Sequence, residues 1–212
     1  MTESPIITFL GQSGFLLEYD NVRLLIDPTN KDSGNCDGEL VYCTHNHFDH
    51  VGGVNVFMER NESALLVCGG QTATKFAKWG DRVKSVDDGE SFTHGPFTLQ
   101  IKYLRHGLFK GMQNLGVVIS TDNFSFAHCG DATDFQGFPM IPVDVLAVPI
   151  VGGFTSGPGK STKMVMNLAD PKPVIVPMHW LFRNPTSFCK KLRNQMPEIK
   201  CVVPVVGEPL KL

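Results

Sequence analysis

Short apolar runs separated by turn residues fill the first part of the chain. The runs are rich in β-branched, aromatic and other apolar side chains, which favour strands. Gly11, the pair Asp20-Asn21 and Pro28 interrupt them with residues typical of turns. The predicted strands are residues 6–10, 15–19, 22–26 and 40–43. This pattern indicates a β-meander.

The rest of the chain alternates between helical spacing of apolar residues and further short apolar runs. Helices are predicted at residues 54–60, 71–78, 161–168 and 186–195. Strands are predicted at residues 64–68, 82–86, 97–104, 116–121, 124–127, 144–149, 173–176 and 201–203. The turn pair Asp122-Asn123 joins two of these strands.

The order of the elements predicts the fold class. Strands are followed by helices, and the same order then repeats, so that each half of the chain begins as a β-run. Two packed sheets with helices outside would bury both sheet faces. We therefore predict an α/β protein, a four-layer αββα sandwich of two similar halves. No linker or low-complexity tract divides it, so residues 1–212 are expected to form one domain.

Composition and charge narrow the class of protein. With 212 residues, 42% of them hydrophobic and 19% charged, the chain resembles an ordinary globular protein. Its formal net charge of -2 lacks the basic excess of general nucleic-acid binders, so no nucleic-acid partner is expected. The chain start lacks a signal-peptide pattern, and no apolar run approaches the ~20 residues of a membrane span. We expect a soluble, cytoplasmic protein without a membrane partner.

The cysteines suggest neither a zinc ribbon nor a thioredoxin-type redox motif, because no two of them form a Cys-x-x-Cys pair. In a reducing compartment they are expected to be free thiols, several of them buried. The six are Cys36, Cys43, Cys68, Cys129, Cys189 and Cys201.

A cluster of metal-ligand residue types follows the predicted strand at residues 40–43. Three of the seven histidines and an aspartate fall within six positions, at His45, His47, Asp49 and His50. A loop leaving a strand can turn these side chains towards one or two ions. Imidazole and carboxylate groups suit zinc, and also iron or manganese. The following Gly52-Gly53 is expected to allow a sharp exit because glycine accepts unusual backbone angles. The alternative is a solvated polar loop.

The segment Thr-His-Asn-His-Phe-Asp-His-Val-Gly-Gly from residue 44 resembles the His-x-His-x-Asp-His signature of the metallo-β-lactamase superfamily. The family's remaining ligands have matching positions near the ends of later strands. The resemblance implies that one metal is held by His45, His47 and His106. It implies that a second is held by Asp49, His50 and His179, and that Asp131 bridges the two.

Other segments resemble the branch of the superfamily that includes L-ascorbate-6-phosphate lactonase and uncharacterised metal-dependent hydrolases. These are the opening turn at residues 11–15, the Leu-Ile-Asp-Pro run at residues 25–28, and residues 148–155 and 173–179. The chain departs from this branch at Gln12, where many members have a histidine. That histidine's contribution to substrate binding is therefore in question here.

Single residues of the set have ordinary alternatives. Taken alone, His106 or His179 would more often be a surface or core histidine, and Asp131 beside a glycine is a common turn residue. We assign His94 to a loop, and expect His128 to pack or hydrogen-bond near the site. Cys129 would be a competent zinc ligand, but the other seven residues make it unnecessary.

The resemblance implies a hydrolase with two divalent ions, zinc in the first place and manganese or iron as alternatives. Such a centre provides a metal-bridging hydroxide near neutral pH, and this hydroxide is the expected nucleophile. Asp49 and Asp131 are the expected catalytic carboxylates. The expected substrate is a small ester, with a lactone as the specific case and an anionic group favoured by nearby cations. Candidate substrate contacts are Gln12, Phe15, Gly152, Gly153, Thr155, Lys160, Trp180 and Arg183.

Three other functions fit the same ligand set. The first is a phosphodiesterase acting on a small phosphodiester. The second is a di-iron redox protein, for which a flavin domain would have to be a separate chain. The third is a catalytically silent metal-binding protein. The sequence leaves the oligomeric state open.

Overall fold

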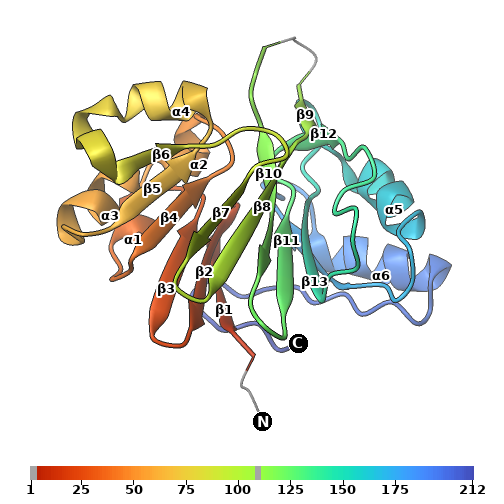
Figure 1. Cartoon of the computed structure of the whole chain (residues 1–212). Helices are drawn as coiled ribbons and strands as arrows, with labels where there is room; N and C mark the ends of the chain where they lie inside the picture. The colour runs from red at the N-terminus through yellow and green to blue at the C-terminus, as the bar shows by residue number, and fades with distance from the viewer. Residues whose placement is uncertain (1–3, 108–110) are drawn as a thin grey trace.

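Two six-stranded sheets lie face to face in the computed structural model, which describes residues 4–107 and 111–212 (Figure 1). The first sheet follows the chain order, with antiparallel pairing up to β3 and parallel pairing from there on. Its strands are β1 (Ile6–Gly11), β2 (Gly14–Tyr19), β3 (Val22–Ile26), β4 (Leu40–Cys43), β5 (Leu65–Cys68) and β6 (Val83–Ser85).

The second sheet repeats this plan, with an antiparallel part followed by a parallel part. Its strands, in spatial order, are β7 (Ser91–His94), β8 (Phe97–Tyr103), β10 (Leu115–Ser120), β11 (Ser125–His128), β13 (Val145–Pro149) and β14 (Val174–Met178). A small antiparallel pair, β9 (Arg105–His106) and β12 (Ala132–Asp134), lies at one end.

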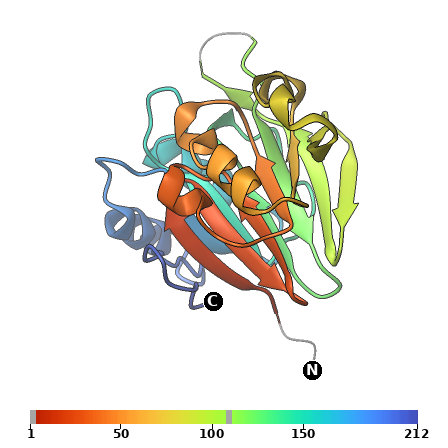
Figure 2. The ribbon, with the colours of Figure 1, turned by 90° about the vertical axis from the view of Figure 1, so that its left-hand side faces the viewer.

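Helices cover the outer faces of both sheets (Figures 1 and 2). On the first sheet lie α1 (Lys31–Gly34), α2 (Phe48–Val51), α3 (Val54–Arg60), α4 (Gly70–Lys75) and the 3₁₀ helix η1 (Ala77–Arg82). On the second sheet lie α5 (Pro158–Met166) and α6 (Pro185–Gln195). The predicted four-layer αββα sandwich with two similar halves is confirmed. No helix in the described ranges is both long and apolar enough to cross a membrane.

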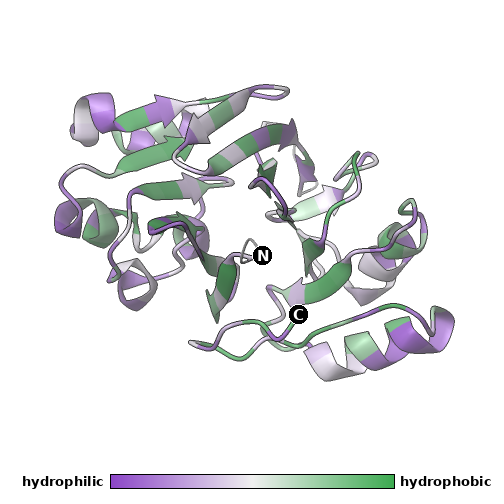
Figure 3. Cartoon of the chain, turned by 60° about the horizontal axis from the view of Figure 1, so that its bottom comes forward, coloured by the Kyte–Doolittle hydropathy of each residue, from purple (hydrophilic) through white to green (hydrophobic). Residues whose placement is uncertain are grey.

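The main core fills the space between the two sheets. Phe9, Phe15 and Leu24 of the first sheet and Phe97 and Phe126 of the second are fully buried there. Figure 3 shows apolar residues concentrated in the strands, while the helices carry many polar residues. Because burial of apolar surface is the dominant favourable term in folding, this shared core holds the two sheets together.

Several predicted elements needed correction. Residues 201–203 do not form a strand, because only an isolated bridge joins Cys201 to Ile175. His94 is not in a loop, since it ends β7 and pairs with Phe97. The short helices α1 and α2 were not predicted, because four residues are too few to show helical spacing.

The expectation that all six cysteines are free thiols was wrong for one pair. Cys189 in α6 and Cys201 form a disulfide, with Cα atoms 5.5 Å apart. The two cysteines are 12 positions apart in the sequence. After α6 the chain returns alongside β14, where Cys201 bridges Ile175, and this return places Cys201 beside Cys189. Cys36, Cys43, Cys68 and Cys129 are free, and all but Cys36 are buried.

Candidate metal centre

The seven predicted ligands converge at one end of the sandwich, from both of its halves. In the first half, the loop after β4 carries His45 and His47, and α2 carries Asp49 and His50. The second half provides His106 in β9, Asp131 after β11 and His179 directly after β14. Neither half alone therefore contains the site.

The first group of donor atoms comprises three imidazoles and one carboxylate. Nε2 of His45 lies 3.0 Å from Nδ1 of His47, which is in turn 3.4 Å from Nε2 of His106. Oδ2 of Asp131 lies 3.8 Å from Nε2 of His45. The four ligand atoms all lie within 4.8 Å of one another.

The second group comprises Asp49, His50 and His179, whose donor atoms also lie within 4.8 Å of one another. Oδ2 of Asp49 is 3.2 Å from Nε2 of His179. Oδ1 of Asp131 is 3.3 Å from Nε2 of His179 and 3.3 Å from Nε2 of His50. Asp131 thus presents one oxygen to each group, which is the geometry of a bridging carboxylate.

Two atoms of this set lack the partners that buried polar groups normally have. Nε2 of His50 and Oδ1 of Asp131 are fully buried and make no hydrogen bond of acceptable geometry, although they face each other. A tetrahedral zinc site with bonds of about 2.0 to 2.1 Å places its ligand atoms about 3.3 to 3.4 Å apart. Most of the observed separations are close to this value, so the residues fit divalent ions.

Asp27, at the end of β3, organises both groups and was not identified as a site residue from the sequence. Its carboxylate accepts hydrogen bonds from Nδ1 of His50 at 2.7 Å and from the backbone N–H and hydroxyl of Thr44 at 2.8 and 2.7 Å. The Thr44 hydroxyl oxygen lies 3.0 Å from Nδ1 of His45. These contacts orient both imidazoles so that Nε2 faces the centre.

A second set of contacts fixes the ligands of the other half. Nδ1 of His106 donates to the backbone carbonyl of Asp131 at 2.8 Å. The buried Asn114 accepts from the backbone N–H of Asp131 at 3.1 Å and donates to the carbonyls of Leu104 and Cys129. Asn114 therefore holds together the loops that carry His106 and Asp131, although it belongs to no metal-ligand motif of the sequence.

Burial and neighbouring charges set the protonation states. Burial, followed by the nearby imidazoles, lowers the pKa of His45 well below its usual value, and the same causes lower the pKa of His47. Burial alone would raise the pKa of Asp131, but His50 and His179 outweigh it and keep the carboxyl ionised. The pKa of Asp49 is lowered in the same way, by His179 and His50.

His50 differs from the other histidines. Burial acts to lower its pKa, but the carboxylates of Asp131 and Asp27 outweigh burial and raise the pKa well above the usual value. In the absence of metal the two carboxylates therefore favour the protonated form of His50. A histidine that binds a metal is neutral, so metal binding competes with this protonation.

Gln12, whose role the sequence left open, lies in the centre. Its side-chain amide donates to Oδ2 of Asp49 at 3.2 Å, and its Nε2 is 3.2 Å from Nε2 of His179. Its backbone carbonyl accepts from the N–H of His179 at 2.7 Å. Where many members of the lactonase branch have a titratable imidazole, this chain has a neutral amide that holds Asp49.

The reason given for Gly52-Gly53 was wrong. Both residues have ordinary right-handed helical angles, with φ of -61° and -92°. Glycine is required here because there is no space for a side chain. A Cβ added at Gly52 would lie 2.3 Å from the carbonyl oxygen of Thr29, and one added at Gly53 would lie 2.4 Å from the carbonyl oxygen of Asn30. The exit from the His-rich segment packs directly against the turn before α1.

Five predicted substrate residues, Gly152 among them, lie in two loops that contact each other. Nε of Arg183 donates to the carbonyl of Val151 at 3.1 Å, which joins the 180–183 loop to the 151–156 loop. Gly153 has a φ of 71° and is exposed, whereas Thr155 is buried. Trp180, beside His179, is partly buried against Phe9.

Phe15, also named as a substrate contact, is fully buried in the core beside Phe9 and Phe126, so that prediction was wrong. Lys160 lies in α5 and lines a cavity that contains none of the candidate metal ligands. His128 is buried and its Nε2 bonds the carbonyl of Ser13, as expected for a packing residue. Cys129 is a buried core residue outside the candidate ligand groups.

Comparison with known proteins gives one family. The Beta-lactamase superfamily domain matches residues 6–179. A metal-dependent hydrolase of Thermococcus kodakarensis is 29% identical over an aligned length of 231 positions. The alignment covers 97% of this chain and 99% of that protein.

Solved structures agree in fold. A metallo hydrolase from Ignicoccus hospitalis superposes with a TM-score of 0.82 at 23% identity, covering 97% of both chains. CmlA, a diiron β-hydroxylase from Streptomyces venezuelae, gives a TM-score of 0.77 at 12% identity, covering this whole chain and 55% of that one. With the domain match spanning most of the chain, and with the fold in agreement, the protein belongs to the metallo-β-lactamase superfamily.

Proposed function

We propose that this protein is a hydrolase that uses two divalent ions, zinc in the first place, to cleave a small ester. One observation carries the proposal: Asp131 turns one oxygen towards each of two histidine-rich groups. His45, His47 and His106 would hold one ion, and Asp49, His50 and His179 the other. The name of the Thermococcus relative, a metal-dependent hydrolase, supports the same reading.

The ions, when bound, would supply Lewis acidity and an activated water molecule. The protein's own groups hold and move protons around them. Asp49 is ionised and only half-buried, so its carboxylate is placed to orient a water molecule by accepting a hydrogen bond from it. Gln12 holds Asp49 by donating to Oδ2. His179 contacts both residues and limits the rotation of the carboxylate.

Exposed aromatic side chains beside the ligands favour a substrate with an apolar group. Phe48, between His47 and Asp49, is 82% exposed. Phe154 is 61% exposed, and its carbonyl accepts from the N–H of Gly107, next to His106. Phe182, in the loop after His179, is 99% exposed. Arg183 in the same loop would favour an anionic group, which is consistent with a carboxylate or phosphate on a small-molecule substrate.

A di-iron oxidase is the second candidate, because CmlA shares the fold and its name states a di-iron centre. Histidine and carboxylate ligands serve iron as well as zinc. Such an enzyme would also need a source of electrons. The metal content of the purified protein separates the two candidates.

The test begins with purification without added metal and elemental analysis. We expect two zinc ions per chain, and turnover in a screen of lactones, other small esters, thioesters and phosphodiesters. Turnover only of phosphodiesters would reassign the substrate class while keeping the metal centre. Two bound metals with no hydrolysis in any class would contradict the proposal, and two irons with oxygen consumption would favour the oxidase.

The bridging role of Asp131 is tested separately. Among the described residues, Asp131 has the only carboxylate that faces both ligand groups, and Asp131→Ala removes it. We expect the variant to lose at least one metal per chain and to lose hydrolysis. Glu59→Ala, at an exposed surface carboxylate, is the control and should keep both metals. Full occupancy in Asp131→Ala would rule out the bridging role.

A further inference from the structure

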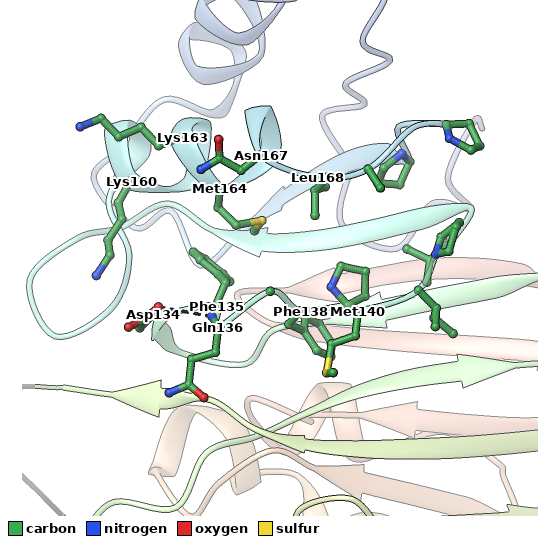
Figure 4. A pocket seen from close by; sticks show the side chains of 18 residues that line it. Asp134, Phe135, Gln136, Phe138, Met140, Lys160, Lys163, Met164, Asn167 and Leu168 are labelled. Atoms are coloured by element: carbon green, nitrogen blue, oxygen red, sulfur yellow. Dashed lines mark hydrogen bonds between the residues drawn. The ribbon is translucent and has the colours of Figure 1, made fainter.

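A cavity of about 630 Å³ lies between α5 and the loop that connects β12 to β13. The loop residues 134–143 form one wall, and α5 with residues 167–173 forms the other (Figure 4). None of the seven candidate ligands lines it. Its volume is in the range of pockets that bind small molecules.

The interior of the cavity is apolar. Phe135 and Phe138, which are 5% and 1% exposed, belong to the connecting loop. Met164 and Leu168 project from the opposite wall towards them (Figure 4). Facing apolar walls of this kind are suited to an alkyl chain, whose transfer from water is favourable for each methylene buried.

One end of the cavity is polar and carries charged side chains of both signs. Lys160 extends from the first turn of α5 across the opening towards Asp134, whereas Lys163 extends away from the opening (Figure 4). Asp134 accepts a hydrogen bond from the N–H of Gln136 at 3.3 Å. Among the ion pairs formed by described residues, none involves Lys160 or Lys163. Lys160 is thus the one ammonium group among the described lining residues that is directed at the opening, where it faces the Asp134 carboxylate.

We propose that this cavity binds an amphipathic monoanion, namely a medium-chain carboxylate. The alkyl chain lies between Phe135 and Phe138 on one side and Met164 and Leu168 on the other. The carboxylate lies at the open end, where the Lys160 ammonium donates to it. A purely apolar ligand would leave Lys160 unused, and a small anion would leave the partly exposed Met164 and Leu168 uncovered. Binding of this ligand requires no metal and is independent of the proposed hydrolase activity.

Decanoate is the probe, titrated below its micelle concentration into the full-length protein and followed by calorimetry and by protein NMR. We expect saturable binding of one decanoate per chain, both in the metal-loaded protein and after chelation. Octanoate should bind about 10-fold more weakly, because two methylenes fewer are buried. Acetate should not bind, and decanol should bind more weakly than decanoate. Equal affinity for decanol, or no saturable decanoate binding, would overturn the proposal.

Two lysine variants of the same helix provide a matched comparison. Lys160→Gln should weaken decanoate binding about 10-fold, the scale of a charge-assisted hydrogen bond. Lys163→Gln removes the same charge from the neighbouring turn and should change the affinity less than 2-fold. Met164→Asn should weaken the binding of decanoate and decanol alike. Equal losses in the two lysine variants would show that only general surface charge is at work.

Two further measurements distinguish a loss of folding from a loss of ligand binding at this cavity. Thermal unfolding identifies any variant that has lost stability, and NMR shift changes confined to residues 134–143 and α5 place the ligand. Shifts confined to the metal ligands would place decanoate at the metal centre and reject this cavity. A shift to larger particles on scattering, without decanoate binding, would mean that the apolar walls join copies of the chain.

Discussion

At the scale of single residues, Asp27 links the two groups of candidate ligands. It is fully buried and has a φ of 43°, an unfavourable backbone angle for an aspartate. Its carboxylate accepts from His50, and through Thr44 it also orients His45. One side chain therefore sets the direction of one imidazole in each group.

Replacing Asp27 with asparagine keeps the shape of the side chain but removes an acceptor oxygen and the charge. We expect Asp27→Asn to weaken metal binding by about 10- to 100-fold, the usual effect of losing such a supporting contact. Competition with a chromogenic chelator measures this affinity. Asp37→Asn, at an exposed carboxylate paired with Arg60, is the control and should leave the affinity unchanged. Equal affinities in both variants would show that Asp27 does not position the ligands.

Gly53 is a second residue whose replacement has a defined effect. In Gly53→Ala the new Cβ would lie 2.4 Å from the Asn30 carbonyl and 2.8 Å from the Gly34 nitrogen, both backbone atoms. We expect a loss of about 1 to 3 kcal/mol in the free energy of unfolding, as for other overpacked sites. Denaturant titration measures it.

The control is another glycine on the same chain. Gly159, in the first turn of α5, has open space around its Cβ position and no left-handed angle. Gly159→Ala should be neutral or stabilise the protein by up to about 1 kcal/mol, because alanine favours helix. Equal destabilisation of both variants would contradict the argument from space.

The residues that could be predicted from sequence are the candidate metal ligands themselves. His45, His47, Asp49 and His50 form a compact motif, and the structure does bring them together with His106, Asp131 and His179. Asp27 and Asn114 could not be found in this way. Their contacts depend on strand pairing and loop packing, which place them beside residues far away in the sequence.

At the scale of elements, the longer strands and helices agreed with the sequence pattern because each has enough residues to show a period. Helix α3 was predicted with its observed bounds, Val54–Arg60. The helices α5 and α6 begin earlier than predicted, at Pro158 and Pro185, because proline in the first turn needs no hydrogen-bonded N–H. Apolar spacing alone gives no signal for such a start.

The disulfide between α6 and Cys201 belongs to this scale. It closes a short loop, for which the loss of entropy in the unfolded chain corresponds to about 3 kcal/mol of stability. We expect reduction to lower the Tm by roughly 6 to 12 °C for a chain of this size. Calorimetry with and without a reductant measures the shift.

The double variant Cys189→Ala with Cys201→Ala provides the control for this prediction. With or without reductant, the double variant should have the Tm that the natural chain shows when reduced. Its Tm should not change when the reductant is added. If the double variant still responds, another cysteine accounts for the effect. If the Tm of the natural chain does not change on reduction, the bond contributes nothing to stability.

At the scale of the whole molecule, the ligands join two sheets that otherwise meet through apolar packing. Bound metal should therefore stabilise the folded chain, since an ion that binds only the folded state adds about 2.7 kcal/mol at 100 times its Kd. We expect chelation to lower the Tm and re-addition of zinc to restore it. In Asp131→Ala the chelator should have a smaller effect. A Tm that is independent of metal would contradict this coupling.

The wide separation of the ligands along the chain also has a consequence for timing. His179 follows His50 by about 130 residues, so at roughly 5 to 20 residues per second it leaves the ribosome about 6 to 26 s later. During that interval the group of Asp49 and His50 lacks its third candidate ligand, although His106 and Asp131 have already been made. Completion of the second proposed ion site is therefore a late event in the life of each new molecule. A ribosome-stalled chain that ends before His179 should lose at least one more zinc to a brief pulse of chelator than the released full-length protein does.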